Sequence, residues 1–149
     1  MTRTAYFLYV KSATSEQALH QALESAPERK EVYVRIVGKD RHGVAFDKQP
    51  WVKEFGLLLI RRFGGGFARD GVGFYANQAG ESFDEDTAEM QVFGTREQIA
   101  AALREILEFL LRYAETTNQE TVFLCINGHA HFLTPEEIRA WLKEDEDDV

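Results

Sequence analysis

The sequence predicts an α+β domain with a ferredoxin-like core, in which strands and helices follow in the order βαββαβ. Three observations predict this fold. Runs of β-branched and aromatic residues recur along the chain, and two stretches with helical spacing of apolar residues lie between them. The chain has 149 residues, of which 44% are hydrophobic, so it can bury a core of its own. Only three prolines and no low-complexity linker occur, which indicates a single domain over residues 1–143.

The first half of this core lies between residues 31 and 77. Residues 31–37 are β-branched and aromatic and predict a strand, followed by a turn and a short strand extension at 44–46. Pro50 fits the first position of a helix, which three glycines after Phe63 would end. Residues 71–77 predict the next strand. The apolar stripe of the helix consists of Trp51, Phe55, Leu58, Leu59 and Phe63.

The second half of the core begins with a strand at 87–93. Apolar side chains alternate there with Glu89 and Gln91, so we expect one wet or partner-facing side of the sheet. A capping box at 95–98 opens the longest helix. A strand at 119–126 completes the core.

Further elements are expected on both sides of the core. An apolar run at 4–10 predicts a strand, and the capping box at 14–17 opens a helix that Pro27 would stop. After the core, residues 130–133 predict a short strand. Residues 134–137 are a strong helix start, with threonine at the N-cap and proline next to it.

The charge of the chain is concentrated at its end. The formal net charge is −8, and residues 144–149 carry five of the acids, so we expect a disordered acidic tail there. A mildly acidic body argues against nucleic acid as a partner. No run of about 18 apolar residues occurs, so we expect no membrane span. The single thiol, Cys125, lies in an apolar run and fits a reducing, cytoplasmic location.

A set of residues between Val32 and Phe132 resembles a family of small bacterial α/β proteins of unknown function. The resemblance covers about two thirds of the chain and implies a ferredoxin-like fold, without catalytic residues to carry over. The matching residues are Trp51, Phe55, 62–67, 70–73, Glu89 and 118–122.

His129 and His131 form the first candidate site. Two histidines at i and i+2 in an extended segment project to the same side, a spacing that can chelate Zn²⁺ or a similar metal. A third ligand would be needed, for which Glu120 and Cys125 are the candidates. The alternative is that residues 127–128 form a turn and both rings lie at the surface.

The second candidate combines three glycines, 64–66, with Arg61, Arg62 and Arg69 as possible anion contacts. A phosphate cradle places its glycines before a helix, whereas these follow one, at its negative end. The favoured interpretation is therefore a helix C-cap with arginines matched to the helix dipole.

Two further groups have a functional and a structural interpretation. Clustered carboxylates at 81–86 (Glu81, Asp84, Glu85 and Asp86) can hold Ca²⁺ or Mg²⁺, but the spacing of a calcium loop is absent and a solvated loop is expected. Aromatic residues on the predicted strands could stack RNA bases, but few basic residues flank them, so we expect core packing. These aromatic residues are Tyr6, Phe7, Tyr9, Tyr33, Phe74 and Tyr75.

No pattern of a known catalytic or cofactor-binding motif occurs, so the leading hypothesis is a non-catalytic binding module without a cofactor. It would present a sheet face or edge to a protein partner or to a second copy of the chain as a homodimer. Two alternatives remain: a small metal-binding protein or enzyme that uses His129 and His131, and an acidic inhibitor or immunity-type protein that binds a basic target.

Overall fold

A computed structural model describes residues 29–147 of the chain. The predicted strand at 4–10 and the helix after it lie outside the described residues. From β1 to β4 the order of strands and helices is the predicted one. The elements are β1 (Arg29–Val37), α3 (Gln49–Phe63), β2 (Phe67–Ala76), β3 (Ser82–Thr95), α4 (Arg96–Thr116), β4 (Val122–Ile126), β5 (His129–Leu133) and α5 (Pro135–Asp147).

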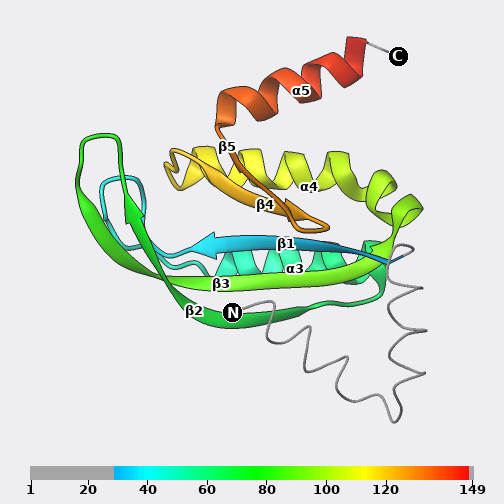
Figure 1. The fold of residues 1–149 in the computed structure, drawn as a ribbon, viewed down its shortest axis with the longest axis horizontal. Coiled ribbons are helices and arrows are strands. Elements are labelled where there is room, and N and C mark those ends of the chain that lie inside the picture. The colour runs from blue at the N-terminus through cyan, green and yellow to red at the C-terminus, as the bar shows by residue number, and fades with distance from the viewer. Residues whose placement is uncertain (1–28, 148–149) are drawn as a thin grey trace.

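The strands form one five-stranded antiparallel sheet in the order β2-β3-β1-β4-β5 (Figure 1). Every second residue of β1, beginning at Val32, belongs to the hydrophobic core, together with buried residues of α3 and α4. Both helices therefore cover the same face of the sheet. Helix α5 packs against α4. The α+β class predicted from the sequence is confirmed.

Both ends of α3 and the start of α4 form as the sequence predicts. Pro50 lies at the start of α3, and Gly64 caps its end with φ of 82°, a left-handed conformation that glycine adopts without steric cost. In α4, Thr95 and Gln98 form the reciprocal capping box. Residues 127–128 form the predicted turn, with positive φ at Asn127.

Strand β3 is longer than the sequence pattern indicates. It begins at Ser82 rather than at residue 87, because its first part pairs with β2 in a long hairpin that joins Gly73 to Glu85 and Val72 to Asp86. The expectation of a solvated acidic loop at 81–86 is therefore wrong for residues 82–86. The predicted strand extension at 44–46 amounts to one isolated bridge between Lys39 and Ala45.

The sequence led us to expect a wet face along β3, on the side of the sheet away from the core. Part of that face is buried. Gln91 is only 1% exposed, since Tyr33 of β1 and Phe67 of β2 lie beside it in register. Glu89 forms an ion pair with Arg69, 3.0 Å apart. The prediction of a wet strand side is therefore wrong at Gln91.

The described part of the chain ends in helix α5. Helix α5 continues to Asp147 and so includes the first acids of the run at 144–149. Within residues 29–147, no helix has the length and apolar composition needed to cross a membrane.

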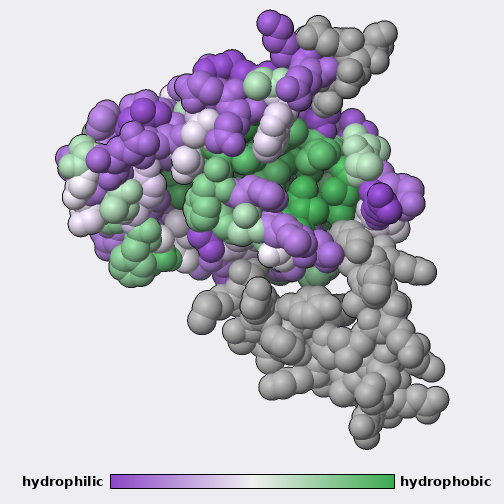
Figure 2. Space-filling model, turned by 45° about the horizontal axis from the view of Figure 1, so that its top comes forward, coloured by the Kyte–Doolittle hydropathy of each residue, from purple (hydrophilic) through white to green (hydrophobic). Residues whose placement is uncertain are grey.

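Figure 2 shows hydrophobic residues gathered in the middle of one face, bordered by hydrophilic ones. Large exposed apolar side chains include Phe74 of β2 and Phe132 of β5.

Candidate functional site

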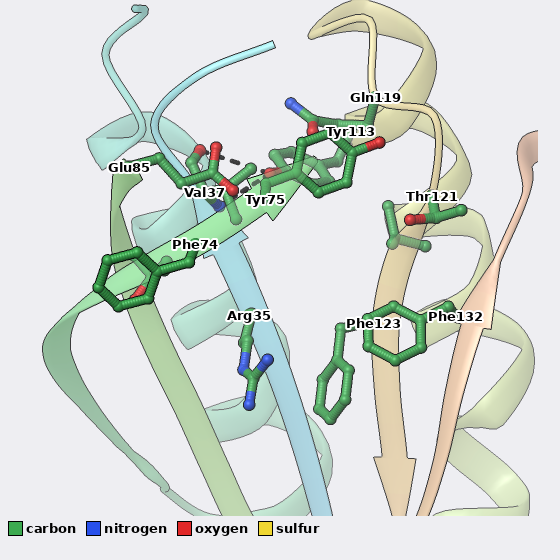
Figure 3. A pocket seen from close by; sticks show the side chains of 13 residues that line it. Arg35, Val37, Phe74, Tyr75, Glu85, Tyr113, Gln119, Thr121, Phe123 and Phe132 are labelled. Atoms are coloured by element: carbon green, nitrogen blue, oxygen red, sulfur yellow. Dashed lines mark hydrogen bonds between the residues drawn. The ribbon is translucent and has the colours of Figure 1, made fainter. Parts of the chain in front are cut away.

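A pocket of about 110 Å³ lies between two pairs of strands, β2–β3 on one side and β4–β5 on the other (Figure 3). The last residues of β1 form its floor. The residues that line it are Arg35, Val37, Gly73, Phe74, Tyr75, Glu85, Thr87, Tyr113, Gln119, Thr121, Val122, Phe123 and Phe132.

Three segments that are distant in the sequence are joined by hydrogen bonds at one end of this pocket. The Arg41 guanidinium donates to the carbonyl oxygen of Gln119 at 3.0 Å, and the Gln119 amide donates to the carbonyl oxygen of Lys39 at 3.0 Å. The Asn77 amide donates to the carbonyl oxygen of Arg41 at 2.8 Å. The loop after β1, the turn of the β2–β3 hairpin and the loop before β4 are thereby held together.

Glu85 of β3 is a carboxyl group of this pocket whose pKa is strongly shifted by its surroundings. Its side chain is buried, and burial raises its pKa to about 7, although Lys39 partly offsets the effect. Opposite it in register lies Gly73, where an added Cβ would approach the Cγ2 of Thr87 to 2.9 Å. Glycine at this position therefore lets β2 and β3 approach closely beside the carboxyl group.

Tyr75 of β2 lies close to Glu85 and forms a polar pair with Glu120. Its hydroxyl group donates a hydrogen bond to Oε2 of Glu120, and the backbone N–H of Gln78 donates to the other oxygen at 3.5 Å. Burial, the hydrogen bond and the negative charge of Glu120 all raise the pKa of Tyr75. Tyr75 therefore stays protonated at neutral pH and acts as a hydrogen-bond donor.

Tyr113 of α4 forms the inner wall. Its hydroxyl group accepts a hydrogen bond from the backbone N–H of Val37 at 2.9 Å, and burial raises its pKa. This bond ties the end of β1 to helix α4, and so fixes the floor of the pocket relative to the helical layer.

The remaining walls are aromatic. Phe123 and Phe132 contact each other edge to face with ring centroids 5.2 Å apart. The guanidinium carbon of Arg35 lies 4.2 Å from the centroid of Phe123. Phe74, which is 86% exposed, stands at the mouth. The expectation that Phe74 and Tyr75 are core residues is therefore wrong, whereas Tyr33 is buried as predicted.

The combination of these groups can bind and transform a small ligand. A carboxyl group with a pKa near 7 exchanges protons readily at neutral pH. Aromatic faces attract cations and stack on planar rings. A pocket that combines both suits a ligand with a planar ring and a positive charge.

The histidines of the predicted metal site lie elsewhere. His129 and His131 are exposed on the edge strand β5. Of the proposed third ligands, Glu120 is bonded to Tyr75 and Cys125 pairs in register with Ala130. Within the part of the chain that the structure describes, no group of three metal-ligating side chains occurs. The metal site stays a prediction without a third ligand.

The three arginines predicted as possible anion contacts are bound to carboxylates. Arg61 and Arg62, in the last turn of α3, both form ion pairs with Glu105, and Arg69 pairs with Glu89. None of the three lines the pocket. They are not brought together as an anion site.

Sequence reasoning missed Arg35, Tyr75 and Glu120 as members of one site and assigned Glu85 to a loop. One signal could have corrected the assignment of Glu85. A strand at 71–77 followed by a short turn needs an antiparallel partner directly after it, which places residues 82–86 in a strand. No comparable signal existed for the other three, because they lie in separate elements.

Comparison with known proteins gives a shared fold. No protein-family model and no curated protein sequence matches the chain, so the resemblance to small bacterial proteins stays a prediction. A solved structure of a phage SAM lyase in complex with S-methyl-5'-thioadenosine is similar, with a TM-score of 0.56 and 12% identity over 72% of this chain and 90% of that chain. A phage SAM lyase in the apo state gives a TM-score of 0.47 with 15% identity, over 71% of this chain and 87% of that chain.

This similarity corrects the functional hypothesis. The fold is shared with an enzyme, which contradicts the prediction of a non-catalytic interaction module and supports neither the metal-protein nor the inhibitor alternative. The prediction relied on missing catalytic motifs. Such motifs are short and local, whereas the polar groups of this pocket come from β1, β2, β3 and the loop before β4.

Proposed function

We propose that the protein is a lyase that binds S-adenosylmethionine in the pocket around Tyr75, Glu85 and Glu120 and cleaves it. The observation that carries the proposal is a buried carboxyl group, Glu85, with a pKa of about 7 beside a tyrosine in an aromatic-walled pocket. The similarity in fold to a phage SAM lyase supports it. We also assign the core to the ferredoxin-like class, because the order β4-β1-β3-β2 arises from the element order βαββαβ.

The pocket has groups for each part of this ligand. The aromatic rings that line the pocket, which include Tyr75 and Tyr113 at the end away from Arg35, offer surfaces for the adenine ring. The Glu85 carboxylate lines the pocket, favours the positive sulfonium centre and can accept hydrogen bonds from ribose hydroxyl groups, and Glu120 adds a negative charge next to the pocket, bonded to Tyr75. Tyr75 holds Glu120 in place through its hydroxyl group.

The expected reaction breaks the bond between the sulfonium sulfur and the side-chain carbon of the amino acid. Its electron pair passes to sulfur, and S-methyl-5'-thioadenosine leaves as a neutral thioether. The amino-acid fragment replaces the lost bond itself, either by ring closure through its carboxylate oxygen or by loss of a proton to a base. Glu85 must be ionised in both cases, as the anion that holds the cation or as that base.

Incubation of the purified protein with S-adenosylmethionine at pH 8 tests the proposal. We expect S-methyl-5'-thioadenosine as a product, detected by liquid chromatography with mass detection. The second product, a lactone or an unsaturated amino acid, identifies the route. Absence of both cleavage and calorimetric binding of S-adenosylmethionine would contradict the proposed function.

Removal of one hydroxyl group tests the role of the Tyr75–Glu120 pair. Tyr75→Phe keeps the ring and removes the hydrogen bond to a charged acceptor, so kcat/KM should fall about tenfold to a hundredfold. Glu120→Gln should give a similar loss, since it removes the charge from the same pair. The two losses together should be far from additive in the double variant, because both act on one bond. Additive losses would mean that the two residues act separately.

A further inference from the structure

Arg35 lies at the opposite end of the pocket from Glu85 and Tyr75 (Figure 3). It projects from β1 between Phe74 and Phe123. Its register partner on β3 is Glu89, four residues along the strand from Glu85, which corresponds to about 13 Å. An extended ligand that reaches Glu85 with one part can therefore reach Arg35 with another.

The guanidinium group of Arg35 is held in a fixed position. Its Nε donates a hydrogen bond to the hydroxyl oxygen of Tyr33 at 3.1 Å, and its carbon lies 4.2 Å from the ring centroid of Phe123. Stacking on one ring and bonding through Nε restrict the side chain without using its two terminal amino groups. A positioned fork of this kind is what recognises a carboxylate through two parallel hydrogen bonds.

The carboxylate nearest in register does not occupy this fork. Glu89 forms an ion pair with Arg69 at 3.0 Å and also takes part in a hydrogen bond with Tyr33. Among residues 29–147, no carboxylate lies within ion-pair distance of Arg35. Against the effect of burial, the Tyr33 hydrogen bond, the Arg69 ion pair and the charge of Arg35 together lower the pKa of Glu89, so Arg35 and Glu89 attract each other from a distance. Among the described residues, Arg35 forms no ion pair of its own, because Glu89 is bound to Arg69.

We propose that Arg35 binds the carboxylate of the substrate and so selects adenosyl compounds that carry an amino-acid group over those that do not. This inference rests on the proposed function, since it assigns one end of the same ligand. Arg35 is a specificity residue in this assignment: it binds the end of the ligand that is remote from the nucleoside.

The test compares two ligands that differ only in the carboxylate, S-adenosylhomocysteine and its decarboxylated form. Neither carries a sulfonium centre, so neither undergoes the proposed cleavage, and calorimetry gives their dissociation constants. Wild-type protein should bind S-adenosylhomocysteine about tenfold to a hundredfold more tightly than its decarboxylated form. Arg35→Met, which keeps an apolar chain against Phe123, should bind the two equally. Arg35→Lys should retain part of the preference, because it keeps the charge and loses the fork.

A matched control removes the same charge at another ring-stacked arginine. Arg112 lies over Phe109 with a distance of 5.8 Å to the centroid, but it is on α4 and pairs with Glu54. Arg112→Met should leave both affinities unchanged. Equal weakening of both ligands by Arg35→Met would overturn the assignment of Arg35 while the proposed function stands. Failure of the wild-type protein to bind either ligand or S-adenosylmethionine would overturn both.

Discussion

Glu85→Gln is expected to lower the rate of S-adenosylmethionine cleavage about a hundredfold or more at pH 8. The substitution keeps the size and polarity of the side chain and removes its ability to ionise, so an effect of this size reports on the carboxylate itself. Steady-state kinetics with detection of S-methyl-5'-thioadenosine measures it.

The pH profile of the wild-type enzyme should report the same group. The pKa of Glu85 is raised to about 7 by burial, so the ionised form gains population as pH rises through that value. We expect kcat/KM to rise with pH and level off above about 8, and this rise should vanish in Glu85→Gln. A rise that persists in the variant would assign the ionisation to another group.

The same substitution should lower the cleavage rate but raise the free energy of unfolding at pH 8. The pKa of Glu85 in the folded protein is about 7, above the ordinary value of 4.5, so the folded state binds more protons than the unfolded state between these values. The free energy of unfolding should therefore fall as pH rises from 4.5 to 7. At pH 8, Glu85→Gln should be more stable than wild type by roughly 1–3 kcal/mol, and at pH 4 the difference should be small. Urea unfolding at both pH values measures this.

The next residue along β3 provides the control. Asp86 is exposed, and its side chain points to the other face of the strand. Asp86→Asn makes the same chemical change outside the pocket, so the rate and the pH dependence of unfolding should match wild type. A comparable loss of rate in Asp86→Asn would mean that the net charge of the hairpin matters, rather than the Glu85 carboxylate.

Phe55→Ala is expected to lower the free energy of unfolding by about 3–5 kcal/mol, the cost of truncating a buried phenylalanine. Phe55 is 1% exposed at the centre of the contact between α3 and α4. Its ring centroid lies 4.9 Å from that of Phe109, and Trp51 contacts both Phe109 and Tyr113. Denaturant unfolding followed by circular dichroism measures the loss.

The same helix offers a control on its outer face. Leu57 is 53% exposed, so Leu57→Ala should change the free energy of unfolding by less than about 1 kcal/mol. Because Tyr113 of the pocket belongs to the same aromatic cluster, Phe55→Ala should also weaken ligand binding. Equal losses of stability from the two substitutions would mean that the core does not centre on this cluster.

The starts and ends of the helices follow from local patterns of residues. The capping box at Thr95, Pro50 at the start of α3 and Gly64 at its end are fixed by interactions within a few residues, so their patterns can be read directly. The apolar periodicity of α3 likewise predicted which of its faces enters the core, since burial of a stripe follows from its spacing. These signals also predicted the order of the elements from β1 to β4.

The set of residues that form the pocket could not be predicted from local patterns, because it depends on how the strands pair. Glu85 differs from its acidic neighbours Asp84 and Asp86 because the pairing of β3 with β2 turns its side chain inward, where it is buried. Glu120 reaches Tyr75 across a separation of 45 residues, and no local pattern encodes that contact. Burial and distance are properties of the assembled sheet, and they raise the pKa of Glu85 to about 7.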